Sequence, residues 1–206
     1  MIIALEGIQA AGKSTTTEFL GKRLRAQVVK ETTANHPFLT QVYDDSHRDD
    51  ATVELGFLVV HANAYRLIDR SQLAICDYSP VKDLLFADDM LSGDDLEFFL
   101  QVYRYLYRGH QIPDLVLYLD VPPETCMARV AGRRQRDAGR AFEQGLTLQR
   151  LARMRRRYQS RLRELGNEVI TLPLTGSESR EAVADQAANM IESRLAHIVP
   201  PRDASS

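Results

Sequence analysis

The stretch Gly7–Thr15, GIQAAGKST, decides how the rest of the chain is interpreted. It follows a short apolar run, Ile2–Glu6, and it leads into a stretch with helical spacing that begins at Lys13. A loop between a strand and a helix presents backbone N–H groups at the start of that helix, where anions bind. The spacing G-x-x-x-x-G-K-S is that of the Walker A loop. The stretch therefore predicts a site for the phosphates of a nucleotide.

The parts of this loop have separate chemical roles. Gly12 lets the backbone approach a phosphate closely, Lys13 supplies a positive charge to the outer phosphates, and the Ser14 hydroxyl can bind Mg²⁺. The predicted phosphate-binding residues are Gly7, Ala10, Ala11, Gly12, Lys13, Ser14 and Thr15. The motif alone leaves a kinase, a GTPase, an ATPase and an inert nucleotide-binding module all open.

Apolar runs alternate with stretches of helical spacing along the chain. Continuous apolar runs are typical of buried parallel strands, and they predict strands at Ile2–Glu6, Gln27–Glu31, Gln72–Asp77, Leu115–Asp120 and Glu168–Leu172. The spacing predicts helices over Lys13–Arg25, Thr52–Ile68, Val81–Met90, Asp94–Tyr107, Glu124–Arg134, Leu148–Leu165 and Ser179–Ala196. This alternation indicates an α/β fold, with a five-stranded parallel sheet and helices on both of its faces.

Length and composition limit the alternatives. The chain has 206 residues, which suits a single domain, assigned here to residues 1–199 with a disordered tail at 200–206. The net charge of −2 gives no reason to expect nucleic acid or a membrane as a partner. Two isolated cysteines, Cys76 and Cys126, fit a reducing cytoplasm, and Cys76 is expected to be a buried thiol.

Several carboxylates fall at the predicted ends of strands, which is where ligands collect in parallel sheets. Glu6, Glu31, Asp77 and Asp120 share this position. Glu31 or Asp77 could accept a proton from an alcohol or hold metal-bound water, although either could also be a polar strand end that faces solvent. Asp120 precedes a proline-rich helix start and is interpreted as structural.

Arginines are frequent between Arg129 and Arg163. Arg129 and Arg133 share a helix face, and the glycines that follow suggest a mobile loop over about 132–145. Such a loop could close over a triphosphate as a cationic lid. A nucleic-acid patch and a solvated helix face are the competing interpretations, and the patch lacks interleaved aromatic residues. The later arginines are expected to form mostly a solvated helix face, namely Arg153, Arg155, Arg156 and Arg157.

Four separated pieces of the chain resemble the deoxyribonucleoside kinases, the family of the deoxycytidine, deoxyguanosine and deoxyadenosine kinases. These pieces are GIQAAGKST, KETTANHPFLTQVYDD, CDYSPVKDLLFA and EQGLTLQRL. The resemblance covers roughly residues 2–158. It implies a P-loop kinase fold with an Arg-rich lid, ATP as the phosphate donor, Mg²⁺, a small nucleoside as the acceptor, and a homodimer formed through helices beside the sheet.

The resemblance also implies roles for individual residues. Glu31 would be the general base and Asp77 the acid on the metal side, together with Ser14. Asp83 would meet the nucleobase. The remaining roles would fall to Tyr43 and Glu143 at the sugar 3′-hydroxyl, to Lys13, Arg129 and Arg133 at the phosphates, and to a third lid arginine that is either Arg134 or Arg136.

Three positions depart from the family pattern. Tyr78 stands where the family usually has an arginine, so the lid arginines or Lys13 would have to compensate. Glu54 replaces a base-reading glutamine and His61 a base-reading arginine, which leaves the choice of nucleobase open. His61 is either protonated against Glu54 and Asp83 or an ordinary helix histidine, and Arg66 is a candidate to replace the missing arginine.

The function that we expect is ATP-dependent phosphorylation of the 5′-hydroxyl of a nucleoside or deoxynucleoside, which gives the 5′-monophosphate and ADP. Two alternatives stand beside it. The stretch PDLVLYLDVPPE is shared in style with thymidylate kinases, whose acceptor is a nucleotide. The departures at Tyr78, Glu54 and His61 favour a module that binds nucleotides without catalysis.

Overall fold

The computed structural model of the chain describes residues 1–31, 49–108, 112–134, 146–164 and 169–198. Within these ranges five parallel strands form one sheet, in the order β2-β3-β1-β4-β5. Its strands are β1 (Ile2–Glu6), β2 (Gln27–Val29), β3 (Ala74–Cys76), β4 (Leu115–Asp120) and β5 (Val169–Pro173). The fold class is therefore the one predicted, an α/β fold built on a parallel five-stranded sheet.

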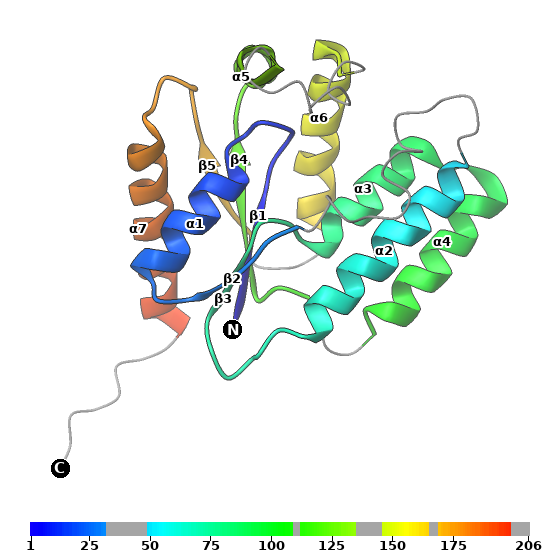
Figure 1. Cartoon of the computed structure of the whole chain (residues 1–206), viewed down its shortest axis with the longest axis horizontal. Coiled ribbons are helices and arrows are strands. Elements are labelled where there is room, and N and C mark those ends of the chain that lie inside the picture. Colours follow the sequence, from blue (N-terminus) through cyan, green and yellow to red (C-terminus); the bar gives the residue numbers. More distant parts are fainter. Residues whose placement is uncertain (32–48, 109–111, 135–145, 165–168, 199–206) are drawn as a thin grey trace.

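Helices cover both faces of this sheet (Figure 1). Their bounds are α1 (Lys13–Arg23), α2 (Asp50–Arg66), α3 (Pro80–Met90), α4 (Gly93–Leu106), α5 (Pro123–Arg134), α6 (Leu148–Glu164) and α7 (Arg180–Ile198). In Figure 1, α1 and α7 lie together on one side, whereas α2, α3, α4 and α6 lie on the other. No helix in the described ranges has the length and apolar character that crossing a bilayer requires.

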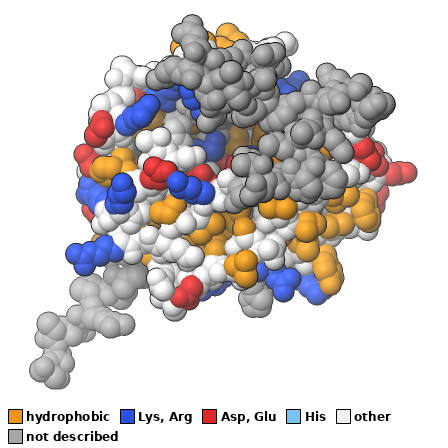
Figure 2. Space-filling model, viewed as in Figure 1, with side chains coloured by type: hydrophobic (Ala, Val, Ile, Leu, Met, Phe, Trp, Pro, Cys, Tyr) orange, Lys and Arg blue, Asp and Glu red, His pale blue; other side chains and the backbone are white. Residues whose placement is uncertain are grey.

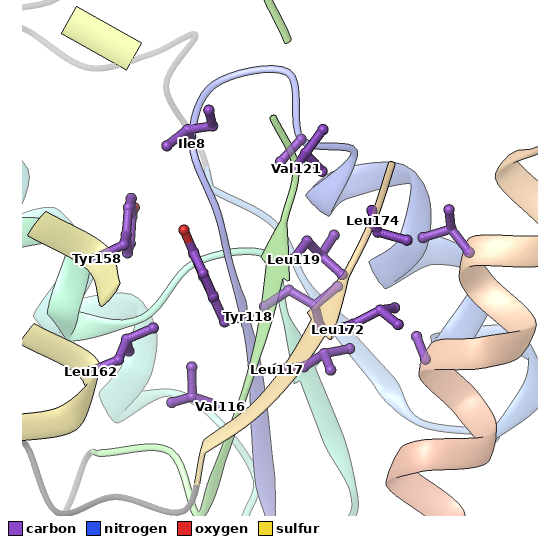
Figure 3. Packing of buried hydrophobic residues seen from close by; sticks show 14 of the residues in the cluster. Ile8, Val116, Leu117, Tyr118, Leu119, Val121, Tyr158, Leu162, Leu172 and Leu174 are labelled. Atoms are coloured by element: carbon purple, nitrogen blue, oxygen red, sulfur yellow. The ribbon is translucent and has the colours of Figure 1, made fainter. Parts of the chain in front are cut away.

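The alternation of side chains along β4 explains why both faces need helices. Leu117 and Leu119 point from β4 toward α1 and α7, whereas Val116 and Tyr118 point toward α6 (Figure 3). All four side chains are at most 2% exposed. Since successive residues of a strand face opposite sides of the sheet, an apolar run buried on both sides must be covered twice.

Strand ends are where the structure departs from the sequence prediction. β1 and β4 begin and end at the predicted residues, but β2 stops at Val29 and β3 stops at Cys76. Glu31 and Asp77 therefore lie in the connections that follow these strands. Helix α2 also begins earlier than predicted, because the Asp49 side chain accepts hydrogen bonds from the backbone N–H groups of Ala51 and Thr52.

Candidate active site

The predicted phosphate loop joins β1 to α1. Gly7, Ala10 and Gly12 have φ angles of 153°, 65° and 108°, and at Gly12 this left-handed conformation favours glycine over any residue that has a Cβ. Gly12 is the N-cap of α1 but makes no side-chain capping bond. The first backbone N–H groups of α1 are thus left without a side-chain cap, which is the arrangement that binds anions.

Two cations hold the loop. Lys13 Nζ donates to the carbonyl oxygens of Gly7 at 2.5 Å and of Ile8 at 3.2 Å. Arg129, on α5, donates to the carbonyl oxygens of Ala10 and Ala11, both at 3.2 Å. Burial lowers the pKa of Lys13, and the charges of nearby carboxylates, Glu6 first, oppose that change. The loop therefore has positive charge both at its helix end and from the neighbouring α5.

Glu6 ties the loop to the turn that precedes α3. Its carboxylate is fully buried and accepts hydrogen bonds from the Ser79 backbone N–H at 2.8 Å and from the Ser79 hydroxyl at 2.6 Å. Burial raises the pKa of Glu6, although the charge of Lys13 and the bonds from Ser79 act against it. The sequence placed Glu6 on this rim without a role, and the structure gives it a structural one.

Glu31 and Asp77 lie together, just beyond the ends of the neighbouring strands β2 and β3. The Glu31 backbone N–H donates to Asp77 Oδ1 at 2.6 Å, and the Asp77 N–H donates to the Val29 carbonyl at 3.1 Å. The Glu31 side chain, only 16% exposed, is directed toward α2 and α3 and not into solvent. This excludes the interpretation of Glu31 as a solvent-facing strand end.

Two cationic groups contact the Glu31 carboxylate. Lys82 Nζ, from α3, bonds Glu31 Oε1, and His61 Nε2, from α2, lies 3.4 Å from the same oxygen. Burial alone would raise the pKa of Glu31, but Lys82 and His61 outweigh it and hold that pKa well below its usual range. The carboxylate is therefore ionised, as a proton acceptor must be. Sequence reasoning missed Lys82 entirely.

His61 joins Glu31 to a second carboxylate. Its Nδ1 lies 2.5 Å from Asp83 Oδ1, and the Tyr107 hydroxyl donates to Asp83 Oδ2 at 3.1 Å. Burial would lower the pKa of His61, but the charge of Asp83 and the bonds to both carboxylates raise it to about 9. Of the two predicted states for this residue the structure supports the protonated one, with Asp83 and Glu31 as the partners to which the ring nitrogens point.

Tyr78 is a packing residue in this structure. It is 1% exposed, its ring centroid lies 4.5 Å from that of His61, and its carbonyl oxygen accepts the Tyr65 hydroxyl at 2.7 Å. Glu54, which is 6% exposed, lies two turns before His61 on the buried face of α2. Four of the residues predicted to bind the substrate therefore lie together between α2 and α3, next to the ends of β2 and β3, namely Glu31, His61, Tyr78 and Asp83.

A comparison with protein families decides which family this is. The family model described as deoxynucleoside kinase matches residues 3–198. The chain belongs to the deoxynucleoside kinase family. Similar curated proteins are kinases of the same kind. The Bacillus subtilis deoxyguanosine kinase is 25% identical over 193 residues, which is 90% of each chain. The Dictyostelium discoideum deoxyadenosine kinase is 24% identical over 196 residues, which is 92% of this chain and 77% of that protein.

Solved structures agree on the fold of this kinase. A deoxyadenosine kinase from M. mycoides with bound dCTP has a TM-score of 0.75 at 19% identity, over 96% of this chain and all of that one. The same protein with bound dATP also has a TM-score of 0.75. At this identity the likeness shows the P-loop kinase fold of the chain, as the sequence predicted.

Other predicted site residues of the kinase are placed less completely. Arg129 and Arg133 lie four residues apart in α5, which continues to Arg134, so residues 132–134 of the predicted lid are helical. Arg66 is exposed at the end of α2 and does not share the buried face that carries His61. Predictions for Tyr43, Arg136, Glu143, the lid stretch 135–145 and the tail 200–206 lie outside the described residues.

The arginines of α6 correct one expectation. Arg155 donates to both carboxylate oxygens of Asp120, at 2.7 and 3.0 Å, which confirms Asp120 as structural. Arg153 and Arg157 lie 3.0 and 3.6 Å from the buried Asp89 of α3. The solvated face that we expected was therefore wrong for Arg155 and Arg157, which are about one third exposed and pack against carboxylates of β4 and α3, whereas Arg153 pairs with Asp89 but remains exposed.

Oxygen atoms of the types that Mg²⁺ prefers as ligands lie near the loop. Ser14 is exposed at the start of α1, and the Asp77 carboxylate is near enough to the loop's Lys13 to interact with it electrostatically. Hydroxyl and carboxylate oxygens are what Mg²⁺ prefers, and in kinases it is usually bound through few protein groups together with phosphates. In the described part of the chain, no three His, Cys, Asp or Glu side chains gather closely enough to bind a metal by themselves.

Proposed function

We propose that this kinase transfers the terminal phosphoryl group of ATP to the 5′-hydroxyl of a deoxynucleoside. One observation carries the proposal. The Glu31 carboxylate, buried and ionised, is held between α2 and α3 by Lys82 and His61, at the same edge of the sheet as the Walker A loop. A base in that position can serve an alcohol placed over a phosphate in the loop.

The phosphates of ATP would bind to the loop that begins at Gly7 and to the start of α1. Backbone N–H groups and Lys13 would contact the phosphate oxygens, while Arg129 supports the loop from α5 and adds positive charge. Arg133, and Arg136 beyond it, would complete the cationic side. Ser14 and Asp77 would hold Mg²⁺, which supplies charge neutralisation at the phosphates when it is bound.

The chemical step needs one proton acceptor and no covalent intermediate. Glu31 takes the proton of the 5′-hydroxyl, the oxygen forms a bond to the terminal phosphorus, and the bond between that phosphorus and the ADP oxygen breaks. Lys13 and the arginines stabilise the charge that spreads over the transferring oxygens. Tyr43 and Glu143 are assigned to the sugar 3′-hydroxyl.

The nucleobase would lie against the buried face of α2 and the start of α3. Glu54, His61, Tyr78 and Asp83 are the residues assigned to it. Ionised carboxylates only accept hydrogen bonds, so the pair Glu54 and Asp83 favours a base with an exocyclic amino group. Similar proteins that are named as deoxyguanosine and deoxyadenosine kinases support this direction. We therefore expect the purine deoxynucleosides and deoxycytidine to be better acceptors than thymidine.

The surface and the thiols support the proposed assembly and location. Val59 of α2 and Phe98 and Tyr105 of α4 are each at least half exposed, and Figure 2 shows hydrophobic side chains gathered on the part of the surface where Figure 1 places these helices. Phe98 and Tyr105 are two turns apart, so they share one face of α4. This supports a homodimer formed through these helices. Both cysteines are free and buried, which supports a cytoplasmic location.

The test is a panel of acceptors with ATP and Mg²⁺, followed by identification of the product. The proposal predicts a 5′-monophosphate and ADP for at least one deoxynucleoside, with thymidine a poor acceptor. Phosphorylation of dTMP but of no nucleoside would support the thymidylate kinase alternative. ATP binding without turnover of any acceptor would support the non-catalytic module, and either result would overturn the proposal.

A further inference from the structure

We propose that Lys82 is a positioning residue of the phosphoryl transfer, which aims the Glu31 carboxylate at the acceptor hydroxyl and supplies the positive charge on the acceptor side. The inference rests on the proposed function, since it assigns a role within the same site. None of the roles assigned from the sequence includes Lys82. In the sequence it is an ordinary helix lysine between a valine and an aspartate.

The place of Lys82 is determined by a chain of short contacts. Helix α3 begins after Ser79, whose hydroxyl accepts the Val81 backbone N–H at 3.2 Å. The same hydroxyl donates to Glu6 at 2.6 Å, so the first turn of α3 is fastened to the end of β1, where the phosphate loop begins. Lys82 lies in that first turn. Its side chain is 19% exposed and reaches across to Glu31.

The other cations of the site are already engaged elsewhere. Lys13 donates to carbonyl oxygens of the loop, and so does Arg129. His61 is shared between Glu31 and Asp83, and its closer contact is with Asp83, at 2.5 Å against 3.4 Å. Among the described residues, Lys82 is therefore the cation that is committed to Glu31.

The neighbouring position offers no charge that could take over this role. Tyr78 occupies the position where a cation was expected from the family pattern, and its side chain is buried among Tyr65 and His61. Lys82 lies four residues further along the chain, so the cation next to Glu31 belongs to α3 and not to the turn that precedes this helix. The Lys82 ammonium also lies 5.6 Å from the Phe86 ring centroid, a contact that restricts the alkyl chain.

The role of Lys82 follows from the proton balance of the step. When Glu31 accepts the proton of the 5′-hydroxyl, the carboxylate becomes neutral and its ion pair with Lys82 ends. The ammonium keeps its charge while negative charge develops on the transferring group, and a fixed cation close by stabilises that charge. No further reactant is needed, because the hydroxyl proton ends on Glu31 and the leaving group is ADP.

A purely structural salt bridge between α3 and the end of β2 would look similar in a static structure. The two roles differ in what they affect. A positioning role acts on kcat, because Glu31 must be aimed only during transfer, whereas a structural role acts on stability and on ATP binding together. Lys30 provides a matched control, because it also pairs with a glutamate, Glu18, next to β2, but at the exposed surface.

The experiment compares Lys82→Met, Lys82→Arg and Lys30→Met in the full-length kinase, with the best acceptor of the panel. We expect kcat of Lys82→Met to fall about 100-fold in a protein that still folds, with KM for ATP close to the wild-type value. Lys82→Arg should retain at least about a tenth of the wild-type kcat, since the positive charge is kept. Lys30→Met should match the wild type.

A second measurement covers the possibility that Lys82→Met does not fold. Lys82→Ala removes the charge together with the alkyl chain and leaves space for a small amine, so added ethylamine should restore part of its turnover in a concentration-dependent way. Unchanged kcat in a folded Lys82→Met overturns the inference, as does a joint loss of kcat, ATP binding and stability that neither arginine nor amine repairs. Failure of the wild type to phosphorylate any nucleoside overturns the proposed function, and with it this inference.

Discussion

Replacing His61 by glutamine should remove a specific part of the pH dependence of the stability of the kinase. The folded structure raises the pKa of His61 from 6.5 to about 9, because Asp83 and Glu31 lie at its two ring nitrogens and outweigh the effect of burial. A group whose pKa is higher in the folded than in the unfolded state stabilises the protein while it is protonated in both. Its contribution is complete below pH 6.5 and is lost as pH rises through 9.

The size of the effect follows from the shift. A difference of one pKa unit corresponds to 1.36 kcal/mol, so the change from 6.5 to about 9 corresponds to about 3 kcal/mol. His61 is only 3% exposed, so solvent screening is small. Compared with His61→Gln, the wild type should therefore gain about 3 kcal/mol more in free energy of unfolding at pH 6 than at pH 10.

The assay is urea unfolding of both proteins at several pH values between 6 and 10, where groups common to both cancel in the difference. NMR titration of the histidine ring protons provides a second readout. The chain has five histidines, and the signal absent from His61→Gln identifies His61. The reasoning would be refuted if the free energies of unfolding of the wild type and His61→Gln changed with pH in parallel over this range. A His61 signal that titrates near pH 6.5 would refute it as well.

Three further predictions concern the loop and the scaffold. Gly12→Ala should weaken ATP binding at least about 10-fold by calorimetry, because a φ of 108° is strained for alanine; unchanged affinity would contradict this. Asp120→Asn should lower the free energy of unfolding by about 1 kcal/mol in urea and leave kcat unchanged, since Arg155 is 32% exposed; a large loss of kcat would show that Asp120 is not merely structural. Leu117→Ala, fully buried between the sheet and its helices, should cost about 2–5 kcal/mol in the same urea assay, and a loss below that range would mean that the core refills the space.

Strands that are buried on both faces could be predicted well from the sequence. Ile2–Glu6 and Leu115–Asp120 are continuous apolar runs, and β1 and β4 have these bounds. The loop that follows β1 was also predicted, for a different reason: its spacing of glycines, lysine and serine is typical of one known loop conformation. The order of the strands in the sheet needed the structure, since it depends on long-range pairing between segments such as β1 and β3.

Strand ends at the candidate site were predicted less well. Glu31 and Asp77 were assigned to strands, but they lie beyond Val29 and Cys76. The Asp77 carboxylate accepts a hydrogen bond from the Glu31 N–H at 2.6 Å. A side-chain acceptor thus stands where the next backbone hydrogen bond between β2 and β3 would be. Hydrophobic periodicity has no means of detecting such a bond, because it records burial and not hydrogen bonding.

Lys82 shows where sequence reasoning stops. A lysine in the first turn of a helix is usually solvated, and no local pattern distinguishes Lys82 from Lys22 or Lys30. Its partner Glu31 is 51 residues earlier, and the contact exists only because α3 packs beside α2 at the end of β2. The sequence nonetheless holds one hint, because Lys82 lies four residues after Tyr78, the position where the family resemblance led us to expect an arginine.

The central claim is that Glu31 removes the proton from the acceptor hydroxyl, and single-turnover phosphorylation by Glu31→Gln tests it most directly. Glutamine keeps the shape of the side chain and cannot accept the proton. The account predicts a rate of phosphoryl transfer at least about 100-fold below that of the wild type, with ATP affinity essentially unchanged. A variant that binds ATP and transfers the phosphoryl group at the wild-type rate would contradict it.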